Sequence, residues 1–351
     1  MKTEILRVNA LAPEREIIMK AAKAIKNGGL VIIPTETVYG IAVNMYDMEA
    51  LERLCRIKKR PQDKAFSLHI ADKHNVYEYV TEVPPAAYRL MLKFWPGPLT
   101  IVFKSPDATI GMRMPDHQAA LEIIRETKNP IVCPSANISG KPAPRSIEQA
   151  LEDLDGLVDL AVDAGRTRLG VESSVIDVTV SPVKILREGA VAKEEIEKIT
   201  AKKIVLLVCT GNSCRSVMAE GLLRKKMKEA NRNDIEVLSA GIMNAAGLGA
   251  TEETKELLRN EGIEVSAHRS QAVSKDLVGE SDLILVMEKI HEQRIKELYP
   301  QARNRIFLLK EFARMSTVDF DIQDPIGRSR DFYANTFSII KEAVERVSKL
   351  I

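Results

Sequence analysis

The sequence contains few of the residues that stabilise secreted or membrane proteins. It has 4 cysteines, 1 tryptophan and 5% aromatic residues in a chain of 351 residues. Four cysteines are too few for a disulfide framework, so a cysteine at a special position is expected to be a reactive group. No segment approaches the ~20 consecutive apolar residues that a membrane-spanning helix requires. We therefore expect neither a disulfide-rich scaffold nor a membrane partner.

An excess of charge of one sign is also missing. The 51 lysines and arginines are nearly balanced by 49 aspartates and glutamates, which leaves a formal charge of +2. Such a chain has no strong basic field, so it would contact nucleic acid only through a local patch. Residues 1–4 carry no apolar leader segment, and the expected location is the cytoplasm.

Length and periodicity predict two α/β domains. A chain of 351 residues is too long for one ordinary core. Short β-branched runs at residues 30–33, 130–133 and 204–208 predict buried parallel strands. Apolar residues recur at helical spacing over residues 13–26, and the pattern stops at Asn27-Gly28-Gly29 as a helix end should. This alternation of strands and helices predicts an α/β fold in both halves.

The predicted domains are residues 1–200 and 201–351. Residues 194–203 form a charged stretch with helical apolar spacing, and a new buried strand begins at Ile204. That strand restarts a complete strand–loop–helix unit, which is expected of a second α/β domain.

The loop after the strand at residues 204–208 has the composition of a phosphate cradle. It reads Cys209-Thr210-Gly211-Asn212-Ser213-Cys214-Arg215-Ser216. A tight turn between a strand and a helix N-terminus directs backbone N–H groups inward, and Gly211 and Asn212 tolerate the left-handed conformations that it needs. Arg215 offers a planar fork to phosphate oxygens. These donors and the Ser216 hydroxyl favour the thiolate form of Cys209.

A thiolate that attacks phosphorus needs an acid to protonate the leaving group. The candidate acid is Asp324, in the segment Asp321-Ile322-Gln323-Asp324-Pro325-Ile326-Gly327. Pro325 stiffens the backbone that follows it. Cys209 and Cys214 lack a second Cys/His pair at ligand spacing, so the sequence predicts neither a zinc site nor a cofactor in this half.

The Cys-x5-Arg-Ser loop and the late Asp-Pro resemble the low-molecular-weight protein phosphatase family over residues 203–351. The resemblance implies a three-layer fold around a parallel sheet. It implies that Cys209 is the nucleophile, Arg215 the transition-state clamp and Asp324 the general acid. In this family, the positions of Asn212, Ser216, Ser239 and His268 support the phosphate loop and tune its thiolate.

The phosphatase substrate is open between phosphoarginine and phosphotyrosine. Arginine phosphatases of this family carry threonine at the position of Ser213, whereas tyrosine-type members usually carry a bulky aliphatic residue. The hydroxyl of Ser213, and the absence of an aromatic ring just after Pro325, favour phosphoarginine. Phosphotyrosine is the alternative. Cys214 also has two interpretations, a packed small apolar residue or the partner of Cys209 in a reversible disulfide.

The N-terminal half has no G-x-x-x-x-G-K-[ST] phosphate loop. Polar residues instead follow two of the buried runs, as Pro-Thr-Glu-Thr-Val-Tyr-Gly at residues 34–40 and Pro-Ser-Ala-Asn-Ile-Ser-Gly at residues 134–140. Ligands of open α/β sheets bind at strand ends, so these segments predict a binding site. Basic residues at positions 58–60, 113 and 187 accompany them.

These segments resemble the YrdC-like threonylcarbamoyl-AMP synthases over residues 5–198, as do Lys58-x-Arg60, Arg113-Met114-Pro115 and Gly-Val-Glu-Ser-Ser-Val-Ile-Asp at residues 170–177. That family joins L-threonine, bicarbonate and ATP, releases pyrophosphate, and supplies the synthesis of N6-threonylcarbamoyladenosine in tRNA. The implied fold is a twisted mixed sheet with helices around a deep electropositive cavity. The implied threonine side is lined by Thr37, His69, Arg113, Ser135 and Ser173. The implied ATP side is lined by Lys58, Arg60, Lys64, Thr109, Asn137, Arg145 and Arg187.

The implied partners are ATP, L-threonine, bicarbonate, the tRNA-modification machinery, tRNA itself and a phosphorylated protein. Mg²⁺ is expected with ATP, and no protein side chain is assigned to it. Two departures bear on ATP contacts, because Lys64-Ala65-Phe66 replaces a small polar residue followed by Pro-Leu, and Arg145 stands where serine or threonine is common. The alternative is a non-catalytic module that binds double-stranded RNA in the same cavity, which would not need the polar residues of the threonine side.

Overall fold

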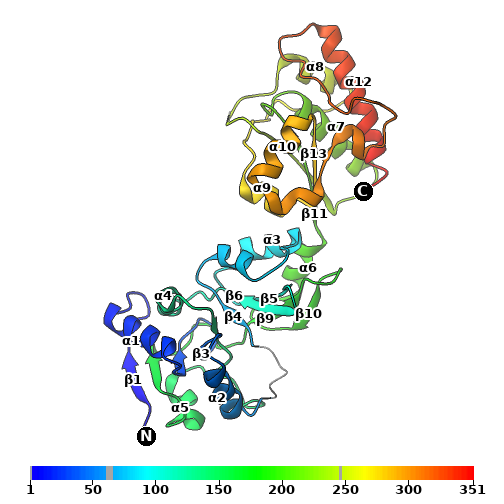
Figure 1. The fold of residues 1–351 in the computed structure, drawn as a ribbon. Helices are drawn as coiled ribbons and strands as arrows, with labels where there is room; N and C mark the ends of the chain where they lie inside the picture. Colours follow the sequence, from blue (N-terminus) through cyan, green and yellow to red (C-terminus); the bar gives the residue numbers. More distant parts are fainter. Residues whose placement is uncertain (1, 61–65, 245–246) are drawn as a thin grey trace. The chain divides into compact units, whose positions relative to one another are not determined.

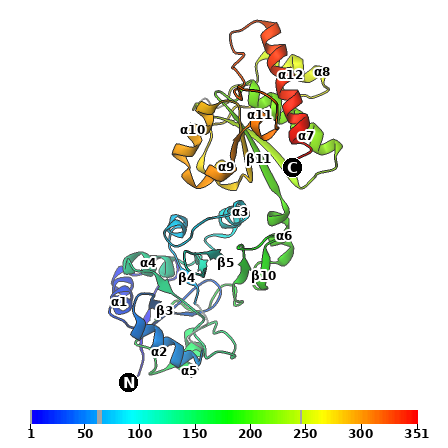
Figure 2. The same ribbon diagram turned by 45° about the vertical axis from the view of Figure 1, so that its right-hand side comes forward.

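The computed structural model describes residues 2–60, 66–244 and 247–351. The chain divides into two compact units, Met1–Thr200 and Ala201–Ile351, and each has its own sheet (Figures 1 and 2). The predicted α/β class is confirmed, with a mixed ten-stranded sheet in the first unit and a parallel four-stranded sheet in the second. Within the described ranges, no helix combines the length and apolar character that a membrane crossing needs.

The sheet of the first unit has the strand order β1-β8-β2-β3-β7-β4-β6-β5-β9-β10. Its strands are β1 (Glu4–Arg7), β2 (Val31–Ile33), β3 (Gly40–Asn44), β4 (Leu68–His69), β5 (Leu99–Lys104), β6 (Thr109–Arg113), β7 (Ile131–Val132), β8 (Leu160–Asp163), β9 (Ser174–Asp177) and β10 (Lys184–Arg187). The strand β2 is parallel to β8 and antiparallel to β3.

One predicted strand orientation is wrong. The run at residues 130–133 forms β7, which is antiparallel to both of its neighbours, β3 and β4. An apolar run that is buried on both faces looks the same in either orientation, so composition could not distinguish them.

Helices cover both faces of this sheet because the side chains of β2 alternate. Val31 and Ile33 lie in one core with α1 (Arg15–Lys26) and α4 (Gln118–Thr127). Leu30 and Ile32 lie in another with α2 (Met48–Lys58) and α5 (Ile147–Leu154). A third core, under β4, β5 and β6, is closed by η1 (Lys73–Glu78), α3 (Pro85–Phe94) and α6 (Lys193–Ala201). Successive strand residues point to opposite faces, which explains the layering.

The second unit has three layers, as expected. Its parallel sheet has the order β12-β11-β13-β14, formed by β11 (Lys203–Cys209), β12 (Ile235–Gly241), β13 (Leu283–Val286) and β14 (Ile306–Leu308). Val205 and Leu207 face α7 (Arg215–Glu229), α8 (Glu252–Asn260), α11 (Leu309–Phe312) and α12 (Arg330–Val347). Leu206 and Val208 share the opposite core with α9 (Lys275–Glu280), α10 (Lys289–Leu298) and η2 (Pro300–Arg305). The carboxyl ends of all four strands therefore meet at one edge.

Candidate active sites

The phosphate loop connects the end of β11 at Cys209 to the start of α7 at Arg215. Its turn depends on Asn212, which is fully buried with φ at 54°. Asparagine tolerates this left-handed conformation better than most residues. Its side-chain Nδ2 donates to Ser216 Oγ at 3.0 Å and to Ser239 Oγ at 2.8 Å. Its side-chain Oδ1 accepts from the backbone amide of Gln271 at 2.9 Å. The loop is therefore held from both β12 and the segment after α8.

Two further contacts support the loop from outside. His268 Nε2 lies 2.8 Å from the carbonyl oxygen of Asn212, so His268 contacts the loop at the position that the sequence predicted. Gly241, at the end of β12, leaves no room for a side chain, because a Cβ there would lie 2.7 Å from the Thr210 carbonyl oxygen. The close approach of this strand to the loop requires glycine.

Cys209 is only 3% exposed, and its sulfur lies close to two possible donors. It is 3.0 Å from Ser216 Oγ and 3.3 Å from the amide nitrogen of Asn212. Because the Asn212 amide group can only donate to Ser216 Oγ, the Ser216 hydroxyl hydrogen is free to donate to sulfur. The sulfur thus lies next to the N-terminus of α7, within reach of a hydroxyl and a backbone amide.

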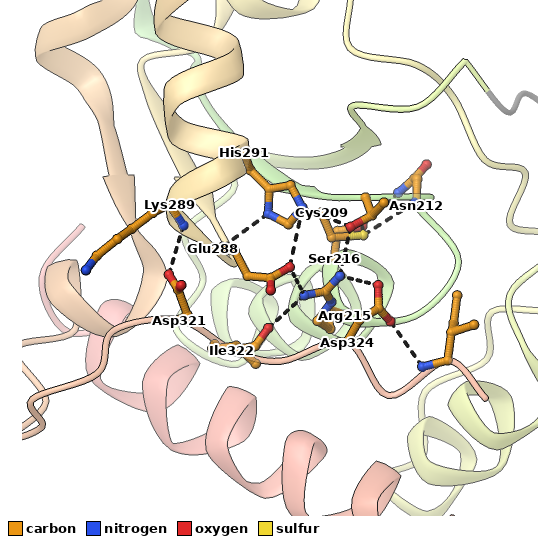
Figure 3. Close-up of polar contacts among 12 residues, drawn as sticks. Cys209, Asn212, Arg215, Ser216, Glu288, Lys289, His291, Asp321, Ile322 and Asp324 are labelled. Carbon is orange, nitrogen blue, oxygen red and sulfur yellow. Dashed lines mark hydrogen bonds and ion pairs between the residues drawn. The ribbon is translucent and has the colours of Figure 1, made fainter. Parts of the chain in front are cut away.

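Arg215 is completely buried and connects the loop to two other segments (Figure 3). Its Nη1 donates to Glu288 Oε2 at 2.5 Å and to the Ile322 carbonyl at 2.7 Å. Its Nη2 donates to Thr210 Oγ1 at 2.9 Å and also to Asp324 Oδ2. Its Nε is buried and has no hydrogen-bond partner within the described ranges. Such a donor is suited to pair with a bound anion.

Asp324 lies beside Arg215 with its side chain 34% exposed, on a segment that is fastened to β13 and its neighbours. The Ile322 amide donates to the Met287 carbonyl at 2.8 Å, and the Lys289 amide donates to Asp321 Oδ1 at 2.8 Å. Contacts to the residue after β13 and to the start of α10 therefore hold the candidate acid near the cradle, over a hundred residues from Cys209 along the chain.

Glu288 and His291, which were not predicted from the sequence, complete this site (Figure 3). Both are near the start of α10, where Glu288 is the residue before the helix. Burial, and then the Arg215 charge, lower the pKa of His291 to about 4. No local motif marks either residue, because Glu288 is 73 positions from the arginine that it contacts.

Cys214 occupies a packed position in the core next to α7. Its sulfur lies 3.5 Å from Thr251 Oγ1 and 3.6 Å from the hydroxyl of Tyr333. Burial raises the pKa of Tyr333, so this hydroxyl stays protonated. Ser213 Oγ lies 3.7 Å from the Cys214 sulfur.

The first unit contains a cavity of about 670 Å³ that brings together residues distant in sequence. Most residues predicted for threonine and ATP line it, namely Lys58, Arg60, His69, Thr109, Arg113, Ser135, Asn137, Ser173 and Arg187. Arg145 lines a neighbouring cavity of about 620 Å³ that shares Asn137 with the first. Lys64 lies outside the described residues.

Arg113 is the best-anchored cation of this cavity. Its Nη2 donates to Glu36 Oε1 at 2.7 Å and to Thr37 Oγ1 at 2.8 Å, and its Nε donates to the Gly97 carbonyl at 3.3 Å. Glu36 is 1% exposed and was not predicted as a site residue. Glu36 lies between Thr35 and Thr37 in the motif at residues 34–40. Its role becomes visible only through the ion pair with Arg113. Thr37 thus belongs to the site through Arg113.

Two more side chains have shifted pKa values for reasons of burial. Burial, and then the Arg60 charge, lower the pKa of Lys58 to about 8, while its Nζ donates to the carbonyl oxygens of Ser135 at 2.5 Å and Asn137 at 2.7 Å. Burial, and then Arg113, lower the pKa of His69 to about 3, so this imidazole is neutral.

The remaining contacts hold the far wall of the cavity. Arg187 donates from Nη1 to Glu172 Oε1 at 2.8 Å and from Nη2 to Ser173 Oγ at 3.1 Å. Ser173 Oγ is 2.9 Å from Thr100 Oγ1, which joins β5 to the loop before β9. Across the described ranges, no group of three or more His, Cys, Asp or Glu side chains is arranged to hold a metal ion.

Two family models match the chain, one in each unit. The family model Sua5_yciO_yrdC, described as telomere recombination, matches residues 23–189, and the low molecular weight phosphotyrosine protein phosphatase model matches residues 204–351. The threonylcarbamoyl-AMP synthase of Pyrococcus abyssi is 40% identical over 212 residues, which are 58% of this chain and 62% of the relative. The chain thus spans less than two thirds of that protein.

Other relatives are covered almost completely. A Mycobacterium tuberculosis relative assigned to the same synthase is 35% identical over 192 residues, which are 52% of this chain and 88% of the relative. The protein-arginine-phosphatase of Geobacillus stearothermophilus is 36% identical over 145 residues, which are 41% of this chain and 93% of the relative. The crystal structure of P. abyssi Sua5 with L-threonine is similar with a TM-score of 0.54 and 29% identity, covering 87% of this chain and 99% of that one.

Proposed function

The chain belongs to the Sua5/YciO/YrdC family through its first unit and to the low-molecular-weight phosphatase family through its second, and we propose that it is a bifunctional enzyme. Residues 1–200 make L-threonylcarbamoyl-AMP from L-threonine, bicarbonate and ATP, for the modification of tRNA. Residues 201–351 hydrolyse phosphoarginine in proteins.

The observation that carries the phosphatase proposal is a cysteine sulfur in contact with a hydroxyl and a backbone amide, in the same loop as a buried arginine that pairs with the partly exposed Asp324. In the first step, the thiolate of Cys209 attacks phosphorus, the bond to the leaving nitrogen breaks, and Asp324 gives its proton to that nitrogen. In the second step, water attacks the phosphocysteine, Asp324 takes a proton from the water, and inorganic phosphate leaves as the thiolate returns. Phosphate oxygens compete with Asp324 for Arg215, which releases the acid for its role.

Ser213 supports phosphoarginine as the substrate, since a hydroxyl at the rim can pair with a guanidinium. The relative from G. stearothermophilus is named a protein-arginine-phosphatase. The second candidate is phosphotyrosine, which is favoured by the exposed side chain of Ile326, 54% accessible just after Asp324-Pro325. Rates measured side by side on phosphoarginine and phosphotyrosine peptides of the same sequence test the choice. A preference for phosphotyrosine would reject the arginine assignment.

The synthase proposal for the first unit rests on its cavity of about 670 Å³. The cavity is lined by Arg113, which Glu36 holds in place, and by a second group of basic side chains. Arg113 is the partner for the threonine carboxylate, and Lys58, Arg60 and Arg187 offset the charge of the polyphosphate. Neutral His69 is able to pair with the substrate hydroxyl or amine without repelling it.

Mg²⁺ would enter this cavity with ATP. The described residues offer no cluster of carboxylates for it, so its ligands would be phosphate oxygens and water, as is common for this ion. Its chemical contribution is to neutralise charge on the phosphates.

The test of the first activity is exchange of labelled pyrophosphate into ATP, with threonine and bicarbonate added singly and together. We expect exchange only when both are present. Exchange that does not depend on threonine would reject the synthase assignment. A protein that catalyses no exchange but binds double-stranded RNA would also reject it. Transfer to tRNA by partner enzymes is the proposed next step.

A further inference from the structure

We infer that His291 is a positioning residue of the phosphatase, which acts by fixing the direction of the Thr210 hydroxyl. The inference rests on the proposed phosphatase function. His291 is fully buried on α10, and its two ring nitrogens contact two different groups (Figure 3). Nδ1 lies 3.1 Å from the backbone nitrogen of Glu288, and Nε2 lies 2.9 Å from Thr210 Oγ1.

The backbone contact determines the tautomer of this histidine. A backbone N–H can only donate, so Nδ1 must present its lone pair to the Glu288 amide. Neutral imidazole carries one hydrogen, which therefore resides on Nε2. Protonation of Nδ1 would break the contact with the amide, and burial with the nearby Arg215 charge opposes it as well. The carboxylates that face this ring, Glu288 at 3.6 Å from Nε2 and Asp324 beyond, favour the cation but do not outweigh burial.

The tautomer in turn determines what Thr210 can do. Its Oγ1 accepts from His291 Nε2 and from Arg215 Nη2, which also can only donate. Both lone pairs of the oxygen are then occupied, so the hydroxyl must direct its own hydrogen elsewhere. Within the described ranges no acceptor is seen for it. The group that can accept it is a phosphoryl oxygen bound in the cradle.

A second hydroxyl of the loop has a related arrangement. Ser216 accepts from the Asn212 amide, and its own hydrogen is free to donate to the Cys209 sulfur. Two hydroxyls of the loop thus accept from groups that can only donate. Ser216 serves the nucleophile, and Thr210, through His291, serves the phosphoryl group.

His291 makes two contacts, one with the Glu288 amide and one with Thr210, and different substitutions remove one or the other. In His291→Asn, the shorter side chain keeps an acceptor for the Glu288 amide but cannot reach Thr210. In His291→Gln, a longer side chain keeps an amide donor near Thr210 at the expense of the contact with Glu288. We expect a three- to tenfold loss of kcat/KM in His291→Asn, with partial recovery in His291→Gln. The inhibition constant of inorganic phosphate should rise by a similar factor.

A double-mutant cycle with Thr210→Val tests the route of action in the full chain. If His291 acts through Thr210, His291→Asn should cause no further loss of kcat/KM in the Thr210→Val background. Additive losses would overturn the inference. The exposed His74 is the matched control, because His74→Asn should leave all phosphatase rates unchanged.

Long-range ¹H–¹⁵N spectra of ¹⁵N-histidine-labelled protein read the tautomer directly, with His291→Asn used for assignment. The expected signal is a protonated Nε2 and an unprotonated Nδ1 between pH 5 and 8. A protonated Nδ1 would overturn the inference even if the variants lose activity. A wild type that hydrolyses neither phosphoarginine nor p-nitrophenyl phosphate would reject the phosphatase function itself, whereas an active wild type with additive losses would reject only the role of His291.

Discussion

At the scale of single residues, Arg113 combines burial with availability to a ligand. Glu36 and Thr37 both engage Nη2, so Nη1 remains for a ligand of the cavity that Arg113 lines. The carboxylate of Glu36 also neutralises the guanidinium, which makes burial of this charge tolerable. Removing the arginine outright would leave Glu36 buried without a partner, at a cost of about 3–5 kcal/mol.

Arg113→Lys is therefore the sharper test of the threonine site. It retains a cation beside Glu36 but loses Nη1, the guanidinium nitrogen that remains for the carboxylate of threonine. We expect the KM for threonine to rise at least tenfold while the KM for ATP changes little. Steady-state kinetics with each substrate varied in turn measure this, with the exposed Arg56→Lys as control. Equal increases in both KM values would mean that Arg113 faces ATP.

Ser213 is the second residue with a testable role, since it is the predicted determinant of the phosphatase substrate. Ser213→Ile should lower phosphoarginine turnover and spare or improve phosphotyrosine turnover, because a methyl group cannot pair with a guanidinium. Ser213→Thr should raise the preference for phosphoarginine. A lost hydrogen bond of this kind is worth about 1–3 kcal/mol, or roughly ten- to a hundredfold in the ratio of rates. An unchanged ratio in Ser213→Ile would contradict the assignment.

The site residues that could be predicted from the sequence lie in recognisable motifs, and these include Asp324, which is far from Cys209 along the chain. The loop from Cys209 to Ser216 is one continuous motif, and its strand and helix follow from local patterns. Glu288 and His291 reach the same loop only because β13 lies next to β11, and no local spacing encodes that neighbour. Glu36 was not predicted because its partner, Arg113, is 77 residues away, and no local sequence pattern marks the two ends of such an ion pair.

At the scale of elements, the segment that carries Asp324 depends on α11. Lys310 is 9% exposed on this helix, and its Nζ donates to the Asp321 carbonyl at 3.0 Å. This bond is one of the few that tie the acid segment to the core. The same element could not be assigned a function from sequence, since a lone lysine on a four-residue helix has no distinguishing pattern.

Lys310→Met should keep the packing of the aliphatic part of the side chain but remove its hydrogen bond to Asp321, and so loosen the segment that carries Asp324. We expect kcat to fall about three- to tenfold with little change in KM, because Asp324 acts in the transition state more than in binding. Phosphatase kinetics of the full chain measure the effect. The exposed Lys349→Met serves as control, and a rise in KM alone would indicate that Lys310 affects the binding of substrate instead.

At the scale of the whole molecule, each unit contains a buried histidine that stays neutral in the fold, His69 in the first and His291 in the second. The folded pKa is about 3 for His69 and about 4 for His291, against an ordinary value of 6.5. Between these values the unfolded chain binds more protons, so stability is intact above about pH 6.5 and falls as the pH drops toward 4. The loss is on the order of 3 kcal/mol per histidine.

Calorimetry of the full chain from pH 7 to pH 4 should therefore show a falling melting temperature. His291→Gln should flatten this dependence for the transition of the second unit and leave that of the first unit unchanged. An equal slope in wild type and variant would show that carboxylates, and not this histidine, govern acid stability in that unit.

The fusion itself leads to the last prediction. Each unit has its own sheet, and the core clusters of the described residues are confined to one unit each, three in the first and two in the second. Neither proposed reaction consumes a product of the other. Cys209→Ser replaces the thiolate with a poor nucleophile of nearly the same size, so phosphatase turnover should vanish while the fold is kept. Adenylate synthesis should stay within about twofold of wild type, a difference well under 1 kcal/mol. Both rates are measured on one preparation, with Arg113→Lys as the reciprocal variant. If Cys209→Ser also abolished synthesis while both thermal transitions remained, the two sites would have to be coupled, and the independence of the units would be rejected.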